Sequence, residues 1–317
     1  MGLYPKNLNE YVASMGIPRG PKSKAFLVDP VNGSDTNPGT TWLAPLKSLE
    51  AAEALCTANQ HDTVLFLAGA TADNPTAEIT WDKSYTHLIG IGSEVYGVGQ
   101  RCRVVASSAS IHNTITFSGN GCIVKNMQFN NEHASGAAVG IALVTGQRNF
   151  FEKVFFMCPT SQDANSYSLK ITDGGENVFK DCTIGQHTLV RNAASFGLWI
   201  AKGAGEANPT RNKFLHCEFL SWSGSANHVL VKVATDVDVE AFTIQFEDCL
   251  FSNINGGSLL TAAIVDGATE THHRIYLRGS NNCVDGCTAV ANPLTYVYTP
   301  DVEDAVSGLI MIAVAES

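Results

Sequence analysis

The chain has few charged residues and no long apolar run. Charged residues make up 16% of 317 positions, and 20 basic residues against 30 acidic ones give a net charge of −10. A nucleic-acid partner requires a basic face, so we expect none. The longest apolar run, Leu309 to Ala315, is far too short to cross a bilayer. Met1 to Glu10 also lacks the basic start and apolar core of a signal peptide, so we expect no membrane partner.

The short motifs of common enzyme classes are also missing. The sequence contains no nucleophile elbow, no phosphate-binding loop and no paired Cys motif. His272 and His273 are adjacent, and adjacent residues of a strand point to opposite faces, so they do not form one metal site. Cys283 and Cys287 lack a second pair at zinc-binding spacing. We expect neither a metal nor a cofactor.

What the sequence does contain is an eight-residue pattern that occurs six times. Its best copy is Asn212 to Phe219, which reads NKFLHCEF. The copies begin at Cys122, Asn149, Asn177, Asn212, Ile244 and Asn282. An irregular repeat of roughly 30 residues is typical of a solenoid with loops inserted in some coils.

Each position of the pattern has a physical interpretation. Positions six and eight alternate as the inward face of a strand requires, whereas positions four and five are mostly polar, which indicates a bend between two short strands. Position three is Val124, Phe151, Phe179, Phe214, Phe246 or Val284. Position six is Met127, Val154, Cys182, Cys217, Cys249 or Cys287. Position eight is Phe129, Phe156, Ile184, Phe219, Phe251 or Ala289.

Position one is an asparagine in four copies. These residues are Asn149, Asn177, Asn212 and Asn282. Asparagine tolerates left-handed backbone and hydrogen-bonds its own turn, so it predicts a corner.

The pattern therefore predicts an all-β fold, a parallel β-helix in which like residues stack on like. We expect an inner phenylalanine ladder of Phe179, Phe214 and Phe246. We expect a cysteine ladder of Cys182, Cys217, Cys249 and Cys287. A repeat of amphipathic helices is the alternative, but the period-two alternation and the many Gly and Asn residues disfavour it.

The nine cysteines indicate a reducing environment. Four of them occupy position six, where a small apolar residue faces inward, so we interpret them as buried thiols. Disulfides are disfavoured because the count is odd and the chain is long enough to need no cross-links. Folding in a host cytoplasm would keep these thiols reduced.

The chain divides into three parts. Residues 1–24 contain Gly16-Ile17-Pro18-Arg19-Gly20-Pro21, which excludes a regular element there, so we expect an extended arm. We expect this arm to bind a partner through Tyr4, Tyr11, Ile17 and Arg19. Residues 25–290 form the β-helix, and residues 291–317 form a C-terminal cap or an oligomerisation segment.

The beginning of the solenoid resembles a known family. Leu46, Leu49, Ala52 and Leu55 predict a short helix over Pro45 to Ala58 that covers the open first coil. The order of VDPVNGSDTNPGT, PLKSLEAAEAL and DTVLFLAG between residues 25 and 70 resembles the opening of pectate-lyase-like right-handed β-helix proteins, above all their bacteriophage versions in tailspikes and other virion proteins. The resemblance implies the fold but no single activity.

Candidate catalytic residues are few. Asp236, Asp238 and Glu240 alternate with valines, so on a strand they would share one face and offer oxygen ligands to Ca²⁺ as in a lyase. A solvated strand face is the alternative interpretation. A glycoside hydrolase needs two carboxylates across the sugar bond, for which Asp163, Asp173, Glu176 and Asp181 are candidates. The four tryptophans Trp42, Trp81, Trp199 and Trp222 are either loop anchors or the lining of a sugar groove.

Two functions follow from these observations. The first is a non-enzymatic structural protein of a bacteriophage virion, a capsid decoration, cement or head-attached protein that binds capsid or tail proteins and forms a homo-oligomer, with a trimer favoured by the resemblance. The second is a tailspike-like or secreted polysaccharide lyase or hydrolase that acts on surface glycans.

Overall fold

The computed structural model describes residues 7–92, 102–134, 139–203, 209–234, 243–255, 257–267 and 274–292, together with two short strands, Val297–Tyr298 and Met311–Ala313. Within these residues the chain forms three parallel sheets and two short helices, so the predicted all-β parallel β-helix is confirmed.

The three sheets contain ten, eight and eight strands. Sheet A contains β1 (Ala25–Val28), β2 (Thr63–Leu67), β4 (His87–Ile91), β7 (Ile123–Lys125), β10 (Phe150–Glu152), β13 (Val178–Lys180), β16 (Asn212–Leu215), β19 (Thr243–Glu247), β22 (Arg274–Arg278) and β25 (Val297–Tyr298). Sheet B contains β5 (Arg103–Ala106), β8 (Gln128–Asn131), β11 (Phe155–Phe156), β14 (Thr183–Arg191), β17 (Glu218–Ser223), β20 (Leu250–Asn253), β23 (Cys283–Asp285) and β26 (Met311–Ala313). Sheet C contains β3 (Ile79–Trp81), β6 (Asn113–Phe117), β9 (Gly140–Val144), β12 (Tyr167–Ile171), β15 (Phe196–Ile200), β18 (Val229–Val233), β21 (Ile264–Asp266) and β24 (Ala291–Asn292).

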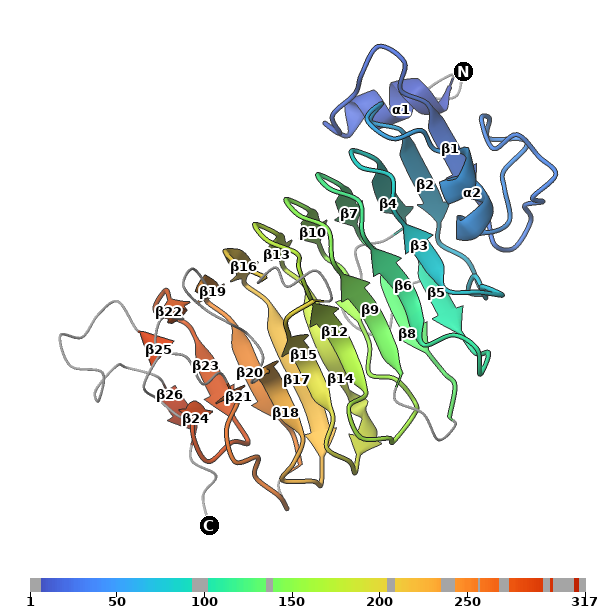
Figure 1. The fold of residues 1–317 in the computed structure, drawn as a ribbon. Coiled ribbons are helices and arrows are strands. Elements are labelled where there is room, and N and C mark those ends of the chain that lie inside the picture. Colours follow the sequence, from blue (N-terminus) through green and yellow to red (C-terminus); the bar gives the residue numbers. More distant parts are fainter. Residues whose placement is uncertain are drawn as a thin grey trace.

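Each complete coil visits the sheets in the order A, B, C, and the coils stack into a rod (Figure 1). Every strand pairs in parallel with the strand of the next coil, for example Phe151 with Phe179 and Phe156 with Ile184. Because the register is conserved from coil to coil, the positions of the eight-residue pattern lie above one another.

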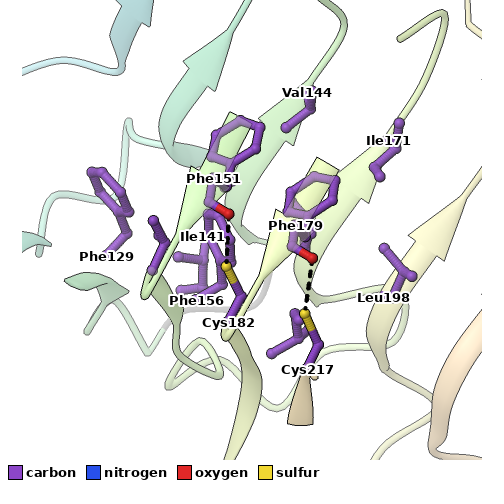
Figure 2. Packing of buried hydrophobic residues seen from close by; sticks show 14 of the residues in the cluster. Phe129, Ile141, Val144, Phe151, Phe156, Ile171, Phe179, Cys182, Leu198 and Cys217 are labelled. Carbon is purple, nitrogen blue, oxygen red and sulfur yellow. Dashed lines mark hydrogen bonds between the residues drawn. The ribbon is translucent and has the colours of Figure 1, made fainter. Parts of the chain in front are cut away.

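Stacked phenylalanines fill the interior, as predicted. Phe151, Phe179, Phe214 and Phe246 are fully buried at position three. The rings of Phe151 and Phe179 stack (Figure 2), with centroids 4.7 Å apart and an interplanar angle of 4°. The ring centroids of Phe179 and Phe214 are also 4.7 Å apart, at 8°. The spacing of neighbouring parallel strands places flat rings at stacking distance, so one residue type serves successive coils.

The cysteine ladder is confirmed at Cys182, Cys217 and Cys249. All nine thiols of the chain are free, and these three are buried. Each donates to a phenylalanine carbonyl of the coil before, with Cys182 Sγ 3.5 Å from Phe151 O and Cys217 Sγ 3.3 Å from Phe179 O (Figure 2). Burial, together with the thiols of Cys182 and Cys249, raises the pKa of Cys217, so it stays protonated and unreactive.

The corners differ from the prediction in one respect. The left-handed residues are those just before position one, such as Arg148 (φ 58°) and Arg211 (φ 57°), and those at position five, such as Asp181 (φ 53°). The asparagines at position one are not among the left-handed residues. Asn149, Asn177 and Asn212 do lie at corners, but the left-handed backbone expected of them is wrong; Asn212 Nδ2 does donate to Pro209 O of its own turn at 3.0 Å.

These asparagines form a buried ladder instead. Asn149 Oδ1 accepts from the amide of Cys122 at 2.7 Å, Asn177 Oδ1 from the amide of Asn149 at 2.8 Å, and Asn212 Oδ1 from the amide of Asn177 at 3.1 Å. Each side-chain NH₂ group donates to a carbonyl of the preceding coil, as Asn177 Nδ2 does to Gly146 O at 3.1 Å. The ladder therefore satisfies backbone groups that the corner removes from the sheets.

The register that the sequence predicts for the sixth copy of the pattern is wrong. Strand β22 pairs with β19, so Leu277 and not Val284 occupies position three of that coil. Val284 pairs with Phe251 and therefore occupies position eight, which assigns position six to Asn282 and removes Cys287 from the ladder. Asn282 Oδ1 accepts from the amide of Cys249 at 2.9 Å, at the corner between sheets A and B. The turn between β22 and β23 is two residues longer than the corresponding turn of the other copies, and this causes the shift. The shift is not visible in the sequence because Asn282 and Cys287 match the residue types of the pattern.

The predicted capping helix is present and shorter than expected. Helix α2 spans Leu49–Leu55 and buries Leu49 and Ala52 against the inner residues of β1. Ser48 Oγ accepts from the amide of Ala51, and the Asp73 carboxylate accepts from the amide of Leu49 at 2.7 Å, so the helix begins at a capped end.

The extended arm is a wrong prediction for residues 8–14. Helix α1 (Leu8–Ser14) lies on the outer face of sheet A, where Leu8, Val12 and Ile17 pack against Leu27 and Ile89, with Ala25 and Leu65 in the same cluster (Figure 1). Asn7 Oδ1 accepts from the amide of Glu10 at 2.8 Å. An Asn with Glu three residues later is a capping signature that favours a helix. The Gly and Pro residues at 16–21 favour an extended chain, and the prediction of an arm rested on them.

The coils also continue past residue 290. Strand β24 pairs with β21, β25 with β22 and β26 with β23, so each sheet gains a further strand. The boundary at 290 is therefore wrong, and part of the predicted C-terminal segment completes the solenoid. The other residues of 293–317 lie outside the described residues.

Candidate functional site

The outer face of sheet C presents a cluster of aromatic and basic side chains. Tyr167 pairs with Phe196, and Lys170 pairs with Trp199, which in turn pairs with Lys232. All five side chains are half-buried and belong to three successive coils, β12, β15 and β18. We call this group the sheet C strip. The inner residues of the same strands, such as Leu169 and Leu198, are fully buried, which fixes the outer positions in place.

Contacts within the strip hold the rings in a fixed arrangement. Tyr167 and Trp199 meet edge to face at 5.7 Å and 71°, and Phe196 lies 5.0 Å from Trp199. Lys170 Nζ lies 3.8 Å from the centre of the Trp199 ring. A cation this close to an aromatic face contributes about 0.5–2 kcal/mol. The strip therefore combines ring faces with an ordered positive charge.

Tyr167 is fixed by a polar network beside the strip. Its hydroxyl donates to Asn113 Oδ1 at 2.5 Å, and Asn113 Nδ2 donates to Glu78 Oε1 at 3.3 Å. Burial, then the negative charge of Glu78, raises the pKa of Tyr167, so the hydroxyl stays protonated. Gly140 lies beneath the ring, where an added Cβ atom would come within 2.2 Å of it. A glycine at this position therefore lets the ring lie flat on the sheet.

The strip has the chemistry of a surface for ring-shaped, acidic ligands. Aromatic faces bind the apolar face of a ring, and lysine ammonium groups attract carboxylates or sulfates. The strip can therefore bind and orient a ligand. Cleavage would require a base or acid beside it.

The structure does not test the first set of predicted acidic candidates for that group. Asp236, Asp238 and Glu240 lie outside the described residues, in the segment between β18 and β19, so their shared face stays a prediction. His272 and His273 also lie outside them. Within the described residues, no three His, Cys, Asp or Glu side chains gather as they would around a metal ion.

The four carboxylates proposed for a hydrolase are divided among three corners. Asp163 precedes β12, Asp173 and Glu176 lie between β12 and β13, and Asp181 lies between β13 and β14. Asp163 therefore lies at the B–C corner, whereas Asp181 lies at the A–B corner, so these two do not face one sugar bond. Only Asp173 and Glu176 share a corner.

Glu176 is held in an ion-pair ladder. Its carboxylate lies 2.6 Å from Arg148 Nε and 2.7 Å from Arg211 Nη2, on the coils before and after it. The hydrogen bond from Arg148 and the charges of both arginines lower the pKa of Glu176, so it remains ionised and is a poor proton donor. Asp181 likewise lies 3.5 Å from His216 Nδ1.

A second ladder crosses the outer face of sheet A. Glu152 lies 2.8 Å from Lys125 Nζ and 3.0 Å from Lys180 Nζ. Partial burial favours the neutral acid, but hydrogen bonds from the two lysines outweigh it and lower the pKa of Glu152. Glu152 on sheet A and Glu176 at its corner thus each link neighbouring coils.

The predicted partner-binding residues that the structure describes make contacts within the chain itself. Ile17 is buried under α1, and Tyr11 meets Trp42 edge to face at 5.5 Å. Arg19 donates to Asn9 Oδ1 at 2.9 Å and to Ser23 Oγ at 3.0 Å. Tyr4 lies outside the described residues. Partner binding by this segment therefore stays a prediction.

The tryptophans do not line a common groove. Trp81 lies in the core, Trp42 packs beside Tyr11, and Trp222 is exposed on sheet B. Only Trp199 belongs to the sheet C strip. The sequence does contain a pattern that predicts the strip. The strands YSLKI, FGLWI and VLVKV all have apolar third and fifth residues, and their outer residues pair in register.

Solved structures with the same architecture include the pectate lyase Pel9A, with a TM-score of 0.54 and 16% identity over 86% of this chain and 65% of that one. The pectin methylesterase PemA from Erwinia chrysanthemi matches with a TM-score of 0.54 and 13% identity over 88% of this chain and 81% of that one. The fold is that of the pectate-lyase-like right-handed β-helices. Geobacillus virus E2 ORF18 matches at a TM-score of 0.48 and 15% identity, over 89% of this chain and 54% of that one, too weakly to support an argument.

No protein-family model matches the chain, and no curated protein matches it in sequence. Identities this low establish the fold and leave the activity open. The chain spans 65% of the length of Pel9A. Neither described helix is long and apolar enough to cross a membrane.

Proposed function

We propose that the protein is a non-enzymatic structural component of a bacteriophage virion, a capsid decoration, cement or other head-attached protein that assembles as a homo-oligomer, most simply a trimer. The observation that supports this proposal is the commitment of outer charged groups to ladders between coils. Glu152 and Glu176 each bridge two basic residues from neighbouring coils, in the way that stiffens a rod.

The interior supports the same role. The phenylalanine, cysteine and asparagine ladders join successive coils in the middle of the rod through stacking and buried hydrogen bonds. Such a rod resists local unfolding because opening one coil exposes the ladders of two neighbours. Rigidity and resistance to proteases are what a protein on the outside of a virion requires.

The test is an assembly experiment with purified phage particles. Light scattering after size-exclusion chromatography gives the mass of the oligomer, and sedimentation with tail-free heads and with isolated tails separates the two locations. Binding to heads by a trimer supports the proposal. Failure to bind either particle, in a protein with a normal unfolding transition, would overturn it.

The sheet C strip favours a second function, which is the binding of acidic glycans. The bound glycan is either cleaved or left intact. Its aromatic rings and Lys170 face the same side of three coils. We expect Trp199→Ala to weaken binding to acidic polysaccharides about tenfold or more, because the stacking of the sugar ring on the indole and the ordering of Lys170 are lost together. Trp222→Ala is the matched control, since that exposed tryptophan lies on sheet B.

Cleavage is measured in the same samples. Release of unsaturated or reducing ends from any polysaccharide that binds would identify a lyase or a hydrolase and would contradict the non-enzymatic proposal. Binding without release would support a virion protein that contacts glycans. Equal binding by wild type, Trp199→Ala and Trp222→Ala would exclude the strip.

A further inference from the structure

Two histidines stack on neighbouring coils at the N-terminal end of the rod, remote in sequence from the sheet C strip. His87 begins β4 and pairs with Thr63 of β2, whereas His61 lies just before β2 in left-handed backbone, with φ of 60°. The rings are 5.3 Å apart with an interplanar angle of 28°, and His61 Nδ1 lies 3.1 Å from His87 Nε2. His87 is 1% exposed, so its polar atoms depend on these contacts.

The hydrogen bonds assign the ring protons. The amide of Ile123 donates to His87 Nδ1 at 3.2 Å, so that nitrogen is an acceptor and carries no proton. The proton of neutral His87 is therefore on Nε2, which donates to Nδ1 of His61. His61 in turn carries its proton on Nε2. One chain of donors thus connects β7, β4 and the turn before β2.

This arrangement does not suit a metal ion. A metal at His87 Nε2 would take its lone pair and move the ring proton to Nδ1, where it would face the N–H of Ile123. A structural zinc site also needs two further ligands. No third His, Cys, Asp or Glu completes such a group among the described residues.

We propose that the His61–His87 pair is an acid-sensitive latch that holds the first coils together and keeps helix α1 seated on them. A proton added to His61 Nδ1 would face the N–H of His87, and a proton added to His87 Nδ1 would face the N–H of Ile123. Either event replaces a hydrogen bond with repulsion between two donors.

The latch is connected to helix α1 through two routes. His87 shares strand β4 with Ile89, which packs in the cluster that Leu8 and Val12 form on sheet A. The segment after α1 also passes close to the turn, because a Cβ atom added to Gly20 would lie 3.0 Å from the carbonyl of Gln60. Opening of the latch therefore loosens the surface that α1 covers.

The charged and titratable groups near the two histidines have other hydrogen-bond partners or are exposed to solvent. Asp62 is buried but its two oxygens accept the amides of Lys24 and Thr57, while the side chain of Lys24 is exposed. The Tyr85 ring lies 5.6 Å from His61, and the Cys122 thiol donates to a backbone carbonyl. Burial, then the charge of His61, lowers the pKa of His87 to about 4 from 6.5, so the stability that neutral His87 contributes is complete above about pH 6.5 and is lost as the pH falls toward 4.

Hydrogen exchange at about pH 7 and about pH 4.5, corrected for the intrinsic rates, tests the latch. In wild type we expect protection of β2, β4, β7 and α1 to fall about tenfold or more relative to β13 and β16. His61→Gln keeps an oxygen that can accept from His87 but does not titrate, so it should abolish this difference. His216→Gln removes an exposed histidine between Asp181 and Asp248 and should leave it unchanged.

The outcomes separate clearly. Loss of the pH effect in His61→Gln but not in His216→Gln supports the latch, and retention of the full effect in His61→Gln overturns it. Nitrogen chemical shifts of the histidine rings in wild type provide a test that needs no variant. A protonated Nδ1 on His87 at about pH 7, or a normal pKa for that ring, would also overturn the proposal.

Discussion

The asparagine ladder offers the sharpest test of how the coils are held together. Asn177 is fully buried, its Oδ1 accepts from the amide of Asn149 at 2.8 Å, and its Nδ2 donates to Gly146 O at 3.1 Å. Asn177→Ala leaves one donor and one acceptor buried without partners. Each such group costs about 1–3 kcal/mol, so we expect the free energy of unfolding to fall by about 2–6 kcal/mol.

Chemical unfolding followed by circular dichroism measures this loss. Asn227→Ala is the matched control because that side chain is exposed, and it should change the free energy by less than about 0.5 kcal/mol. Asn177→Asp keeps an acceptor for Asn149 but removes the donor to Gly146 and buries a charge, so it should be at least as destabilising as alanine. A loss below about 1 kcal/mol in Asn177→Ala would refute the ladder as a source of stability.

Three further predictions concern other parts of the fold. Cys217→Asp should prevent folding, because it buries an unpaired charge between Cys182 and Cys249; near-normal soluble yield and melting would disprove the interior assignment. Deleting residues 2–20 should expose the apolar seat of α1 and lower the melting temperature, whereas an unchanged melting curve would show that α1 contributes no stability. Burial raises the pKa of Asp73 to about 6 from 3.8, so its ionisation destabilises the fold as the pH rises through 6; Asp73→Asn should add about 1–3 kcal/mol of stability at about pH 7.5 and little at about pH 4, measured by unfolding at both pH values.

The repeat could be predicted from sequence because its positions repeat the same physical demand. The inward residues at positions three, six and eight are apolar in the first five copies of the pattern, and Phe179, Cys217 and Phe251 show this directly. The register of the last copy could not be predicted this way. Asn282 and Cys287 match the pattern in letters, but hydrogen bonding between β20 and β23 decides which residues face each other.

The sheet C strip was beyond the sequence analysis for a related reason. Tyr167, Phe196 and Lys232 are separated by loops of different lengths, and only the pairing of β12, β15 and β18 brings them together. Helix α1 was missed because Gly16 and Pro18 obscured a short amphipathic segment whose value lies in the sheet that it covers. Tertiary contacts thus decided both features, where local preference was weak.

The distribution of outer chemistry explains why structural and glycan-binding roles are compatible in one rod. On sheet A and at its corners, Glu152 and Glu176 each bridge two basic side chains from neighbouring coils, so these charged groups link the coils. On sheet C, the Lys170 ammonium lies 3.8 Å from the centre of the Trp199 ring, so a positive charge and an aromatic face lie side by side on the outer surface. A rod that is fixed to a particle through another surface could present sheet C to a ligand, so the two proposed roles are compatible. The particle-binding and glycan-binding experiments therefore address two faces of the molecule, and a positive result in one does not weaken the other.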